Sequence, residues 1–361
     1  MLEESPESTE HRARRVHDSA VVIDTHIDTI THLLWHEHEF DQRLSDARVD
    51  IPRLREGGVS AAFFAVWVDD RYDENAALQY TLRGIDAMYR TIDRYPDDLA
   101  LALSADDVAQ AKAEGKTAVL LSVEGGRALS DDLGVLRMLY KLGVRSITLC
   151  WGNATNWIDS CNEEIHGGLT DFGSGIVREM NQIGMIPDIS HVSDRAFYDV
   201  IEATERPVFA SHSSCRDLTP APRNMTDDMI ATLADIGGVV NINFGSGFVA
   251  QDPAHAHQAR LNDWDDIDYD GWGRIGVASG EAGPPLEALI DHFQRAIDLV
   301  GADHVGIGSD FDGVDAVPQE MEDIGKLPRI TEELLARGYS DNEVTQVLGG
   351  SNMRLFRETM G

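Results

Sequence analysis

The chain has 361 residues, which is enough for one large barrel domain or for two smaller domains. Its formal net charge of −33 argues against nucleic acid and against anionic membrane surfaces as partners. Only four of the 30 basic residues are lysines, and an acidic, lysine-poor surface favours a high-salt cytoplasm in which counterions screen self-repulsion. An ordinary acidic enzyme is the alternative interpretation of this composition.

Residues 1–18 are polar and lack the apolar core of a signal peptide, so we expect an N-terminal tail or a short entry helix there. No run in the sequence reaches the ~18 apolar residues that a membrane span requires. Cys150, Cys161 and Cys215 form no C-x-x-C pair and are odd in number, which predicts free thiols in a reducing compartment. These features together predict a cytoplasmic protein without a membrane partner.

Buried strands alternate with helices along the rest of the chain. The strands are predicted at residues 21–29, 59–68, 117–126, 144–151, 185–191, 207–212, 238–244 and 304–313. Helices are predicted at residues 74–95, 133–143, 172–183, 194–203, 226–236 and 284–300. Eight such units indicate an α/β protein with a closed (β/α)₈ barrel. A doubly wound open sheet is the weaker alternative, because no glycine-rich phosphate turn follows the first strand.

We therefore expect residues 19–361 to form a single (β/α)₈ catalytic domain that ends in short C-terminal helices. A long polar and aromatic segment at about 245–285 interrupts the pattern, and its length is typical of a functional insertion that covers a site. His32, His36 and His38 lie in a segment without strand pattern, so we interpret them as rim or surface residues.

Histidine and carboxylate side chains stand at the ends of five predicted strands. In chain order these candidates are His26 and Asp28, Glu124, His191, His212, and Asp310. Any one of them alone also fits a buried hydrogen bond or a helix cap. In a barrel, however, the carboxyl ends of the strands converge on one pocket, where three imidazoles and two carboxylates can hold two divalent metal ions. Glu124 is the natural bridge, and Gly125 and Gly126 after it permit a tight turn.

At these residues the chain resembles the membrane (renal) dipeptidase family. The resemblance runs from about Val21 to the C-terminus and rests on I-D-T-H-I-D, S-V-E-G-G, D-I-S-H-V-S, S-H-S-S and G-I-G-S-D-F-D-G, in that order. It implies a barrel hydrolase with two zinc ions that cleaves dipeptides, often with a D-residue in the C-terminal position. By resemblance, one zinc is held by His26, Asp28 and Glu124, and the other by Glu124, His191 and His212. The family also suggests a homodimer.

The resemblance assigns two further roles. Asp310 matches the acid/base residue, and Arg223 matches the residue that binds the terminal carboxylate of the substrate. The chemistry agrees: two zinc ions would produce a metal-bridging hydroxide, an aspartate can move its proton, and a guanidinium fork pairs with a carboxylate. Asp312 has the same strand parity as Asp310, so the residues alone leave that choice open. An arginine after Pro222 could equally be a surface residue.

One position departs from the family. Trp151 stands where characterised members often carry a histidine that contacts the substrate. An indole N–H can donate a hydrogen bond but carries no positive charge. Either Asn153 or Asn156 supplies a polar contact instead, or the substrate differs. A related amidase or lactonase acting on a small carboxylated molecule is therefore an alternative to the dipeptidase, and a non-catalytic metal-binding protein is a third possibility.

Overall fold

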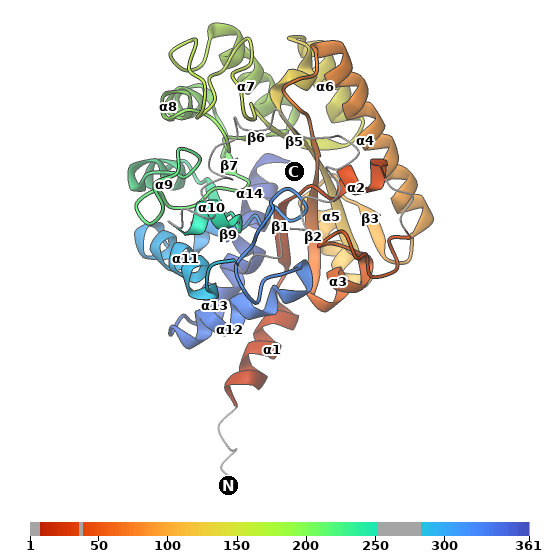
Figure 1. Cartoon of the computed structure of the whole chain (residues 1–361), viewed down its shortest axis with the longest axis vertical. Helices are drawn as coiled ribbons and strands as arrows, with labels where there is room; N and C mark the ends of the chain where they lie inside the picture. The colour runs from red at the N-terminus through yellow and green to blue at the C-terminus, as the bar shows by residue number, and fades with distance from the viewer. Residues whose placement is uncertain (1–7, 36–38, 251–282, 361) are drawn as a thin grey trace.

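The computed structural model describes residues 8–35, 39–250 and 283–360. Nine strands of the described chain form one parallel sheet in the order β2-β1-β9-β8-β7-β6-β5-β4-β3. Because β2 also pairs with β4, eight of them close into a barrel, and the helices surround it (Figure 1). The strands are β1 (Val22–Ile27), β2 (Val59–Trp67), β3 (Leu99–Leu101), β4 (Thr117–Glu124), β5 (Val144–Thr148), β6 (Ile186–Asp188), β7 (Phe209–Ala210), β8 (Val239–Ile242) and β9 (Val305–Ile307). The predicted (β/α)₈ fold is confirmed.

The six helices predicted between the strands are present, and their ends differ from the prediction by two residues at most. They are α4 (Glu74–Arg94), α6 (Leu133–Lys141), α7 (Asp171–Ile183), α8 (Asp194–Ala203), α9 (Asp227–Asp235) and α11 (Leu286–Val300). The other described α-helices are α1 (Thr9–Ser19), α2 (Thr29–Trp35), α3 (Ile51–Glu56), α5 (Ala105–Ala113), α10 (Ser246–Val249), α12 (Pro328–Ala336), α13 (Asp341–Thr345) and α14 (Ser351–Thr359). Most of the expected insertion, including His255 and His257, lies outside the described residues.

Strand ends and one short strand differ from the prediction. The strands β6, β7 and β9 stop at Asp188, Ala210 and Ile307, so the predicted strands extend two to six residues beyond the paired backbone. The reason is that the following residues lie buried in the barrel mouth without belonging to a strand. The strand β3 was not predicted. It has only three residues, which pair with the first residues of β4, and this is too short for a periodic signal.

The N-terminal segment forms the helix α1, which begins at the N-cap Ser8. Its apolar side buries Ala13 and Val16. His17 joins two other parts of the chain, because its Nε2 lies 2.9 Å from the Gly57 carbonyl oxygen and its Nδ1 lies 2.7 Å from Thr331 Oγ1. The helix packs against α12 and α13 at the end of the barrel remote from the strand carboxyl ends (Figure 1).

An apolar core fills the half of the barrel that lies away from the carboxyl ends of the strands. Phe63 of β2 packs edge-on against Phe209 of β7, with ring centroids 5.8 Å apart, and against Phe356 of α14 at 5.6 Å. Ile23 and Leu120 belong to the same buried cluster. Because side chains occupy this end, polar residues can gather only at the opposite mouth, where the strands finish.

The three cysteines are free, as predicted. Among the described residues, no helix combines the length and the apolar character that crossing a bilayer would need.

Candidate metal centre

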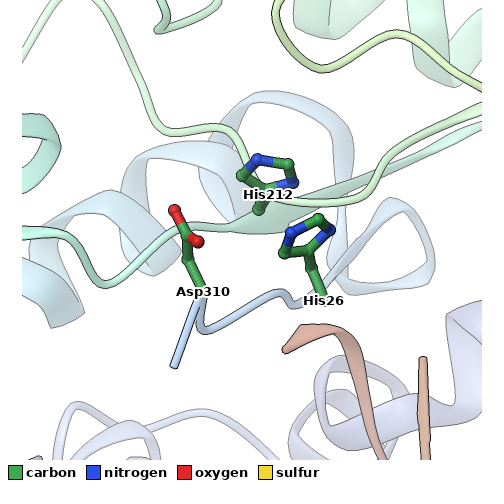
Figure 2. A group of neighbouring side chains, drawn as sticks. All are labelled: His26, His212 and Asp310. Carbon is green, nitrogen blue, oxygen red and sulfur yellow. The ribbon is translucent and has the colours of Figure 1, made fainter. Parts of the chain in front are cut away.

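The five predicted metal ligands come together at the carboxyl ends of the strands. Their ligand atoms form two groups that share one residue, and each group lies within 4.8 Å: His26, Asp28 and Glu124 in one, and Glu124, His191 and His212 in the other. These are the two sets that the family resemblance implies. A third group joins His26 and His212 to Asp310, and Figure 2 shows these three side chains around one small space.

Glu124 lies at the centre of the cluster because it is the last residue of β4. Its Oε2 lies 3.3 Å from His26 Nε2, while its Oε1 lies 2.8 Å from His191 Nε2 and 3.3 Å from His212 Nε2. Each carboxylate oxygen thus faces a different set of ligands. A carboxylate placed in this way can bridge two cations.

The donor atoms fit divalent cations. The Nε2 atoms of His191 and His212 are 3.1 Å apart, and His26 Nε2 lies 3.4 Å from Asp28 Oδ2. Asp28 Oδ1 is buried and has no hydrogen-bond partner among the described residues. Buried lone pairs left without hydrogen-bond donors are costly unless a cation or water occupies the space between them. Imidazole and carboxylate donors together suit zinc and its neighbours in the first transition row.

The charges in the cluster act strongly on one another. Burial disfavours the charged form of His26, but the carboxylates of Glu124 and Asp28 outweigh it and raise its pKa well above 6.5. Burial and the nearby Arg223 guanidinium lower the pKa of His191 to about 4, so this imidazole is neutral at pH 7. Burial, with the positive charges of His26 and Arg223, also holds the pKa of His212 well below 6.5. Neutral imidazoles are the form that binds a metal.

His212 is oriented by a buried chain that sequence reasoning did not identify. Ser211 Oγ lies 2.6 Å from His212 Nδ1 and 2.5 Å from Asp188 Oδ2. The Asp188 carboxylate accepts only, so it takes the Ser211 hydroxyl proton, and Ser211 Oγ in turn accepts the proton on Nδ1. This tautomer leaves the Nε2 lone pair of His212 facing Glu124. Hydrogen bonds of this kind hold metal-binding histidines in position.

The structure shows that Asp310 and Asp312 have different surroundings, a difference that the sequence pattern does not indicate. Asp310 points into the cluster, and Asn243 Nδ2 donates to its Oδ2 at 2.8 Å. Asp312 instead accepts hydrogen bonds from Thr29 Oγ1 at 2.7 Å and from the Arg48 backbone N–H at 2.6 Å. Both oxygens of Asp312 therefore form hydrogen bonds with segments that follow β1.

Asp28 and Asp310 are two buried carboxyl groups of the cluster. Burial is the largest cause that raises the pKa of both groups, and the charges of neighbouring carboxylates add to it. Gly313 lets the two groups meet, because a Cβ there would lie 2.1 Å from Asp28 Oδ2 and 2.6 Å from Asp310 Oδ1.

Unusual backbone conformations surround the site. His191 has φ of +73° and Asp310 has φ of +62°, in the left-handed region that costs a non-glycine residue about 1–3 kcal/mol. Gly125, with φ of +110°, turns the chain away from β4 directly after Glu124. A Cβ on Gly126 would lie 2.2 Å from the Leu149 carbonyl oxygen. The two glycines thus have the structural role that the sequence predicts.

Arg223 lies buried beside the cluster and is not on the surface. Its Nη2 donates to the His212 carbonyl oxygen at 2.9 Å, and its Nη1 donates to Ser213 Oγ at 3.2 Å. The guanidinium also lies over the Phe248 ring, 5.5 Å from the centroid. No carboxylate of the described chain forms an ion pair with it, and its Nε is buried without a hydrogen bond to the described residues. A buried cation without an anion is the natural site for an anionic group of a ligand.

The two predicted substrate contacts after β5 differ in position. The Trp151 ring lies 6.4 Å from the His191 ring and packs edge-on against Trp67 at 4.8 Å, so it stands at the rim of the cluster. Asn153 is exposed, and its backbone N–H donates to Asp70 Oδ2 at 2.7 Å. The exposed Asn156 amide binds carboxylates outside the cluster. The structure therefore does not bring either asparagine side chain to the metal ligands.

The interpretation of His32 as a rim or surface residue is wrong. It lies in the helix α2 and is buried, with its Nε2 3.9 Å from Asp312 Oδ1. The short helix follows β1 without a clear start signal, so the segment looked like a loop. His36 and His38 lie outside the described residues.

Comparisons with known proteins agree with this geometry. The family described as "Membrane dipeptidase (Peptidase family M19)" matches residues 10–360. Dipeptidase verJ of Clonostachys rogersoniana is 36% identical over 322 residues, which cover 86% of this chain and 75% of the relative. Dipeptidase 3 of Mus musculus is 32% identical over 317 residues, which cover 86% of this chain and 58% of the relative.

Solved structures show the same architecture. The probable dipeptidase PvdM from Pseudomonas aeruginosa matches with a TM-score of 0.87 at 23% identity, over 99% of both chains. A metallo peptidase from Rhodobacter sphaeroides, liganded with a phosphinate mimic of the dipeptide L-Ala-D-Ala, matches with a TM-score of 0.78 at 26% identity. That match covers 94% of this chain and 99% of the other.

Proposed function

The chain belongs to the membrane dipeptidase family, peptidase family M19, and is a metallo-dipeptidase; from this premise we propose that it works with two zinc ions. One ion would be held by His26, Asp28 and Glu124, and the other by Glu124, His191 and His212. The two overlapping groups of ligand atoms and the buried, unpaired oxygen of Asp28 support this assignment. Bound there, two zinc ions supply a more acidic water and polarise the scissile carbonyl.

The single observation that carries the choice of substrate is the buried Arg223. Its guanidinium has no carboxylate partner in the described chain and lies next to the backbone of His212. A free C-terminal carboxylate would pair with its planar fork, and the distance from there to the ligands would restrict the substrate to two residues. The relative solved with a mimic of L-Ala-D-Ala supports dipeptides with a C-terminal D-residue as substrates.

Asp310 is the proposed acid/base residue. Asn243 holds its Oδ2, which leaves Oδ1 to take the proton of the attacking water and return it to the leaving amine. Burial and the charges of Asp28 and Glu124 raise the pKa of this carboxyl, so it readily holds a proton. Burial also excludes bulk water, because Asp310 is only 7% exposed.

The test combines metal analysis with a panel of dipeptides that includes L-Ala-L-Ala and L-Ala-D-Ala. We expect two zinc ions per chain and hydrolysis of both isomers. Arg223→Ala should raise KM by at least tenfold for substrates with a free C-terminal carboxylate, and should leave amidated substrates unaffected. Arg195→Ala is the matched control, since that arginine is exposed on α8 and pairs with Asp199 at 2.8 Å. Bound zinc without dipeptide turnover would reject the proposed substrate.

A related amidase or lactonase that acts on a small carboxylated molecule is the second candidate. The Trp151 indole at the rim favours it, because it gives this part of the pocket no positive charge. Turnover of such amides or lactones at rates above those of dipeptides would support this candidate. The third possibility, a non-catalytic metal-binding protein, loses support because all five predicted ligands lie together in the described structure.

A homodimer in the cytoplasm stays a prediction from the sequence. Light scattering of the purified protein would test the dimer, and cell fractionation would test the location.

A further inference from the structure

The loop that carries Trp151 is held by two carboxylates. The Asn153 N–H donates to Asp70 Oδ2 at 2.7 Å, and the Ala154 N–H donates to Glu163 Oε2 at 2.9 Å. Two consecutive backbone donors are thus directed at anionic acceptors. Hydrogen bonds to ionised acceptors are about twice as strong as those between neutral groups.

Asp70 reaches this loop across the end of β4. It lies three residues beyond β2, whereas Trp151 lies three residues beyond β5, and β4 with Glu124 stands between these two strands. Glycine at 152 permits the approach, since a Cβ there would lie 3.0 Å from Asp70 Oδ2. The side chain of Asp70 is only 9% exposed.

Trp151 of this loop packs against Trp67. These two rings meet edge-on at 4.8 Å, and Trp67 is in register with Glu124 on the neighbouring strand. The pair therefore forms an aromatic wall next to the bridging carboxylate, and Trp151 also lies 6.4 Å from the His191 ring. If the loop moved outward, this wall would separate while the metal ligands kept their places.

We propose that Asp70 is a positioning residue, which sets the affinity for substrate by holding Trp151 against Trp67. The proposal rests on the proposed function, because it takes the indole wall to line the substrate pocket. It assigns Asp70 no contact with substrate or metal.

The charge environment of Asp70 adds a pH dependence. Burial raises the pKa of Asp70 to about 7, although the Asn153 N–H and Arg127, whose Nε lies 3.9 Å away, oppose the shift, and the charge of Asp69 adds to it. A protonated carboxyl is a weaker acceptor for the Asn153 amide. The hold on the loop should therefore weaken as the pH falls through about 7.

Asp70→Asn tests the proposal, with Asp69→Asn as the matched control. Asp69 is the adjacent buried aspartate, and its Oδ2 pairs with Arg71 at 2.7 Å. In the metal-loaded enzyme we expect Asp70→Asn to raise KM about tenfold, with kcat changed by less than about twofold and with unchanged zinc content. In a Trp151→Ala background the same substitution should have no further effect on KM. An equal effect in both backgrounds, or an equal effect of Asp69→Asn, would overturn the proposal.

A spectroscopic readout separates this proposal from the proposed function. Two indoles in contact couple in the near-UV circular dichroism spectrum, and Trp151→Phe identifies their share of the signal. We expect Asp70→Asn to lose that share, Asp69→Asn to keep it, and the wild-type signal to fall below about pH 7. Absence of dipeptide turnover in the wild type would reject the proposed function, while the spectra would still decide whether Asp70 holds the wall.

A second variant covers the case in which Asp70→Asn does not fold. Gly152→Ala places a methyl group against Asp70 Oδ2 and should reproduce the rise in KM and the spectral loss. A folded Gly152→Ala protein with wild-type KM and spectrum would contradict the proposal.

Discussion

The hydroxyl of Ser211 offers a sharp test of how this centre is built. Ser211→Ala removes the group between Asp188 and His212, but it leaves the Asp188 carboxylate with donors from Thr148 Oγ1 at 2.5 Å and from the backbone of Ser190 and Ser211 at 3.0 and 2.8 Å. The carboxylate therefore stays satisfied, and the loss falls on the orientation of His212.

The magnitude follows from these contacts. Losing a partner of this kind typically weakens metal binding by about 10–100-fold, or about 1.4–2.8 kcal/mol. Only the ion held by His191 and His212 should be affected, because the ligands of the other ion do not contact Ser211. The metal-free protein should lose about 1–3 kcal/mol of unfolding free energy, because the buried His212 Nδ1–H is left without its acceptor.

The assay is a competition titration of zinc against a chelator, together with denaturant unfolding of the metal-free protein. Ser146→Ala is the matched control, because this buried serine on β5 donates to the Ile186 carbonyl oxygen at 3.0 Å, away from the cluster. It should cost about 1 kcal/mol of unfolding free energy, as expected for one hydrogen bond, and leave both zinc affinities unchanged. If Ser211→Ala bound both ions as tightly as the wild type, the reasoning about the His212 tautomer would be refuted.

Three further predictions concern stability. Gly126→Ala should destabilise the fold by about 1–3 kcal/mol because its Cβ would meet the Leu149 carbonyl, whereas Gly175→Ala, with open space in α7, should be neutral or stabilising; equal unfolding midpoints would contradict this. Burial lowers the pKa of His17, so on acidification the unfolded state takes up the proton at a higher pH than the folded state does. The difference in unfolding free energy between the wild type and His17→Gln should therefore shrink as the pH falls below 6.5, and a difference that does not change with pH would contradict this. With a net charge of −33, molar KCl should raise the unfolding midpoint, and no effect of salt would reject adaptation to high salt.

Local sequence patterns predict most of the strands and several helix ends of this fold. The apolar runs at 59–68 and 117–126 predict central strands because both faces of a barrel strand are buried, and the structure confirms β2 and β4 there. Helix ends were also readable, since Ser193 and Thr226 cap α8 and α9 as serine and threonine commonly do. The missed elements, β3, α2, α3, α5 and α10, have nine residues or fewer, which is too short for a clear periodic signal.

The candidate site was predictable in its residue types and only partly in its contacts. Placing ligands after strands suffices to bring His26 and Glu124 together, because parallel strands of a closed barrel end at one mouth. The role of Asp312 as a support for the segments after β1, the burial of Arg223 and the contact of Ser211 with His212 could not be read in the same way. Each depends on the course of a loop after a strand has ended.

The sequence by itself determined the barrel, the five candidate ligands and their order along the chain, because burial and strand periodicity are local properties that neighbouring residues record. Only the tertiary structure decided that Asp310 faces the cluster, that Arg223 is a buried cation without a carboxylate partner in the described chain, and that Asp70 holds the loop of Trp151. These contacts join residues up to 83 positions apart, and such distances are set by packing between elements.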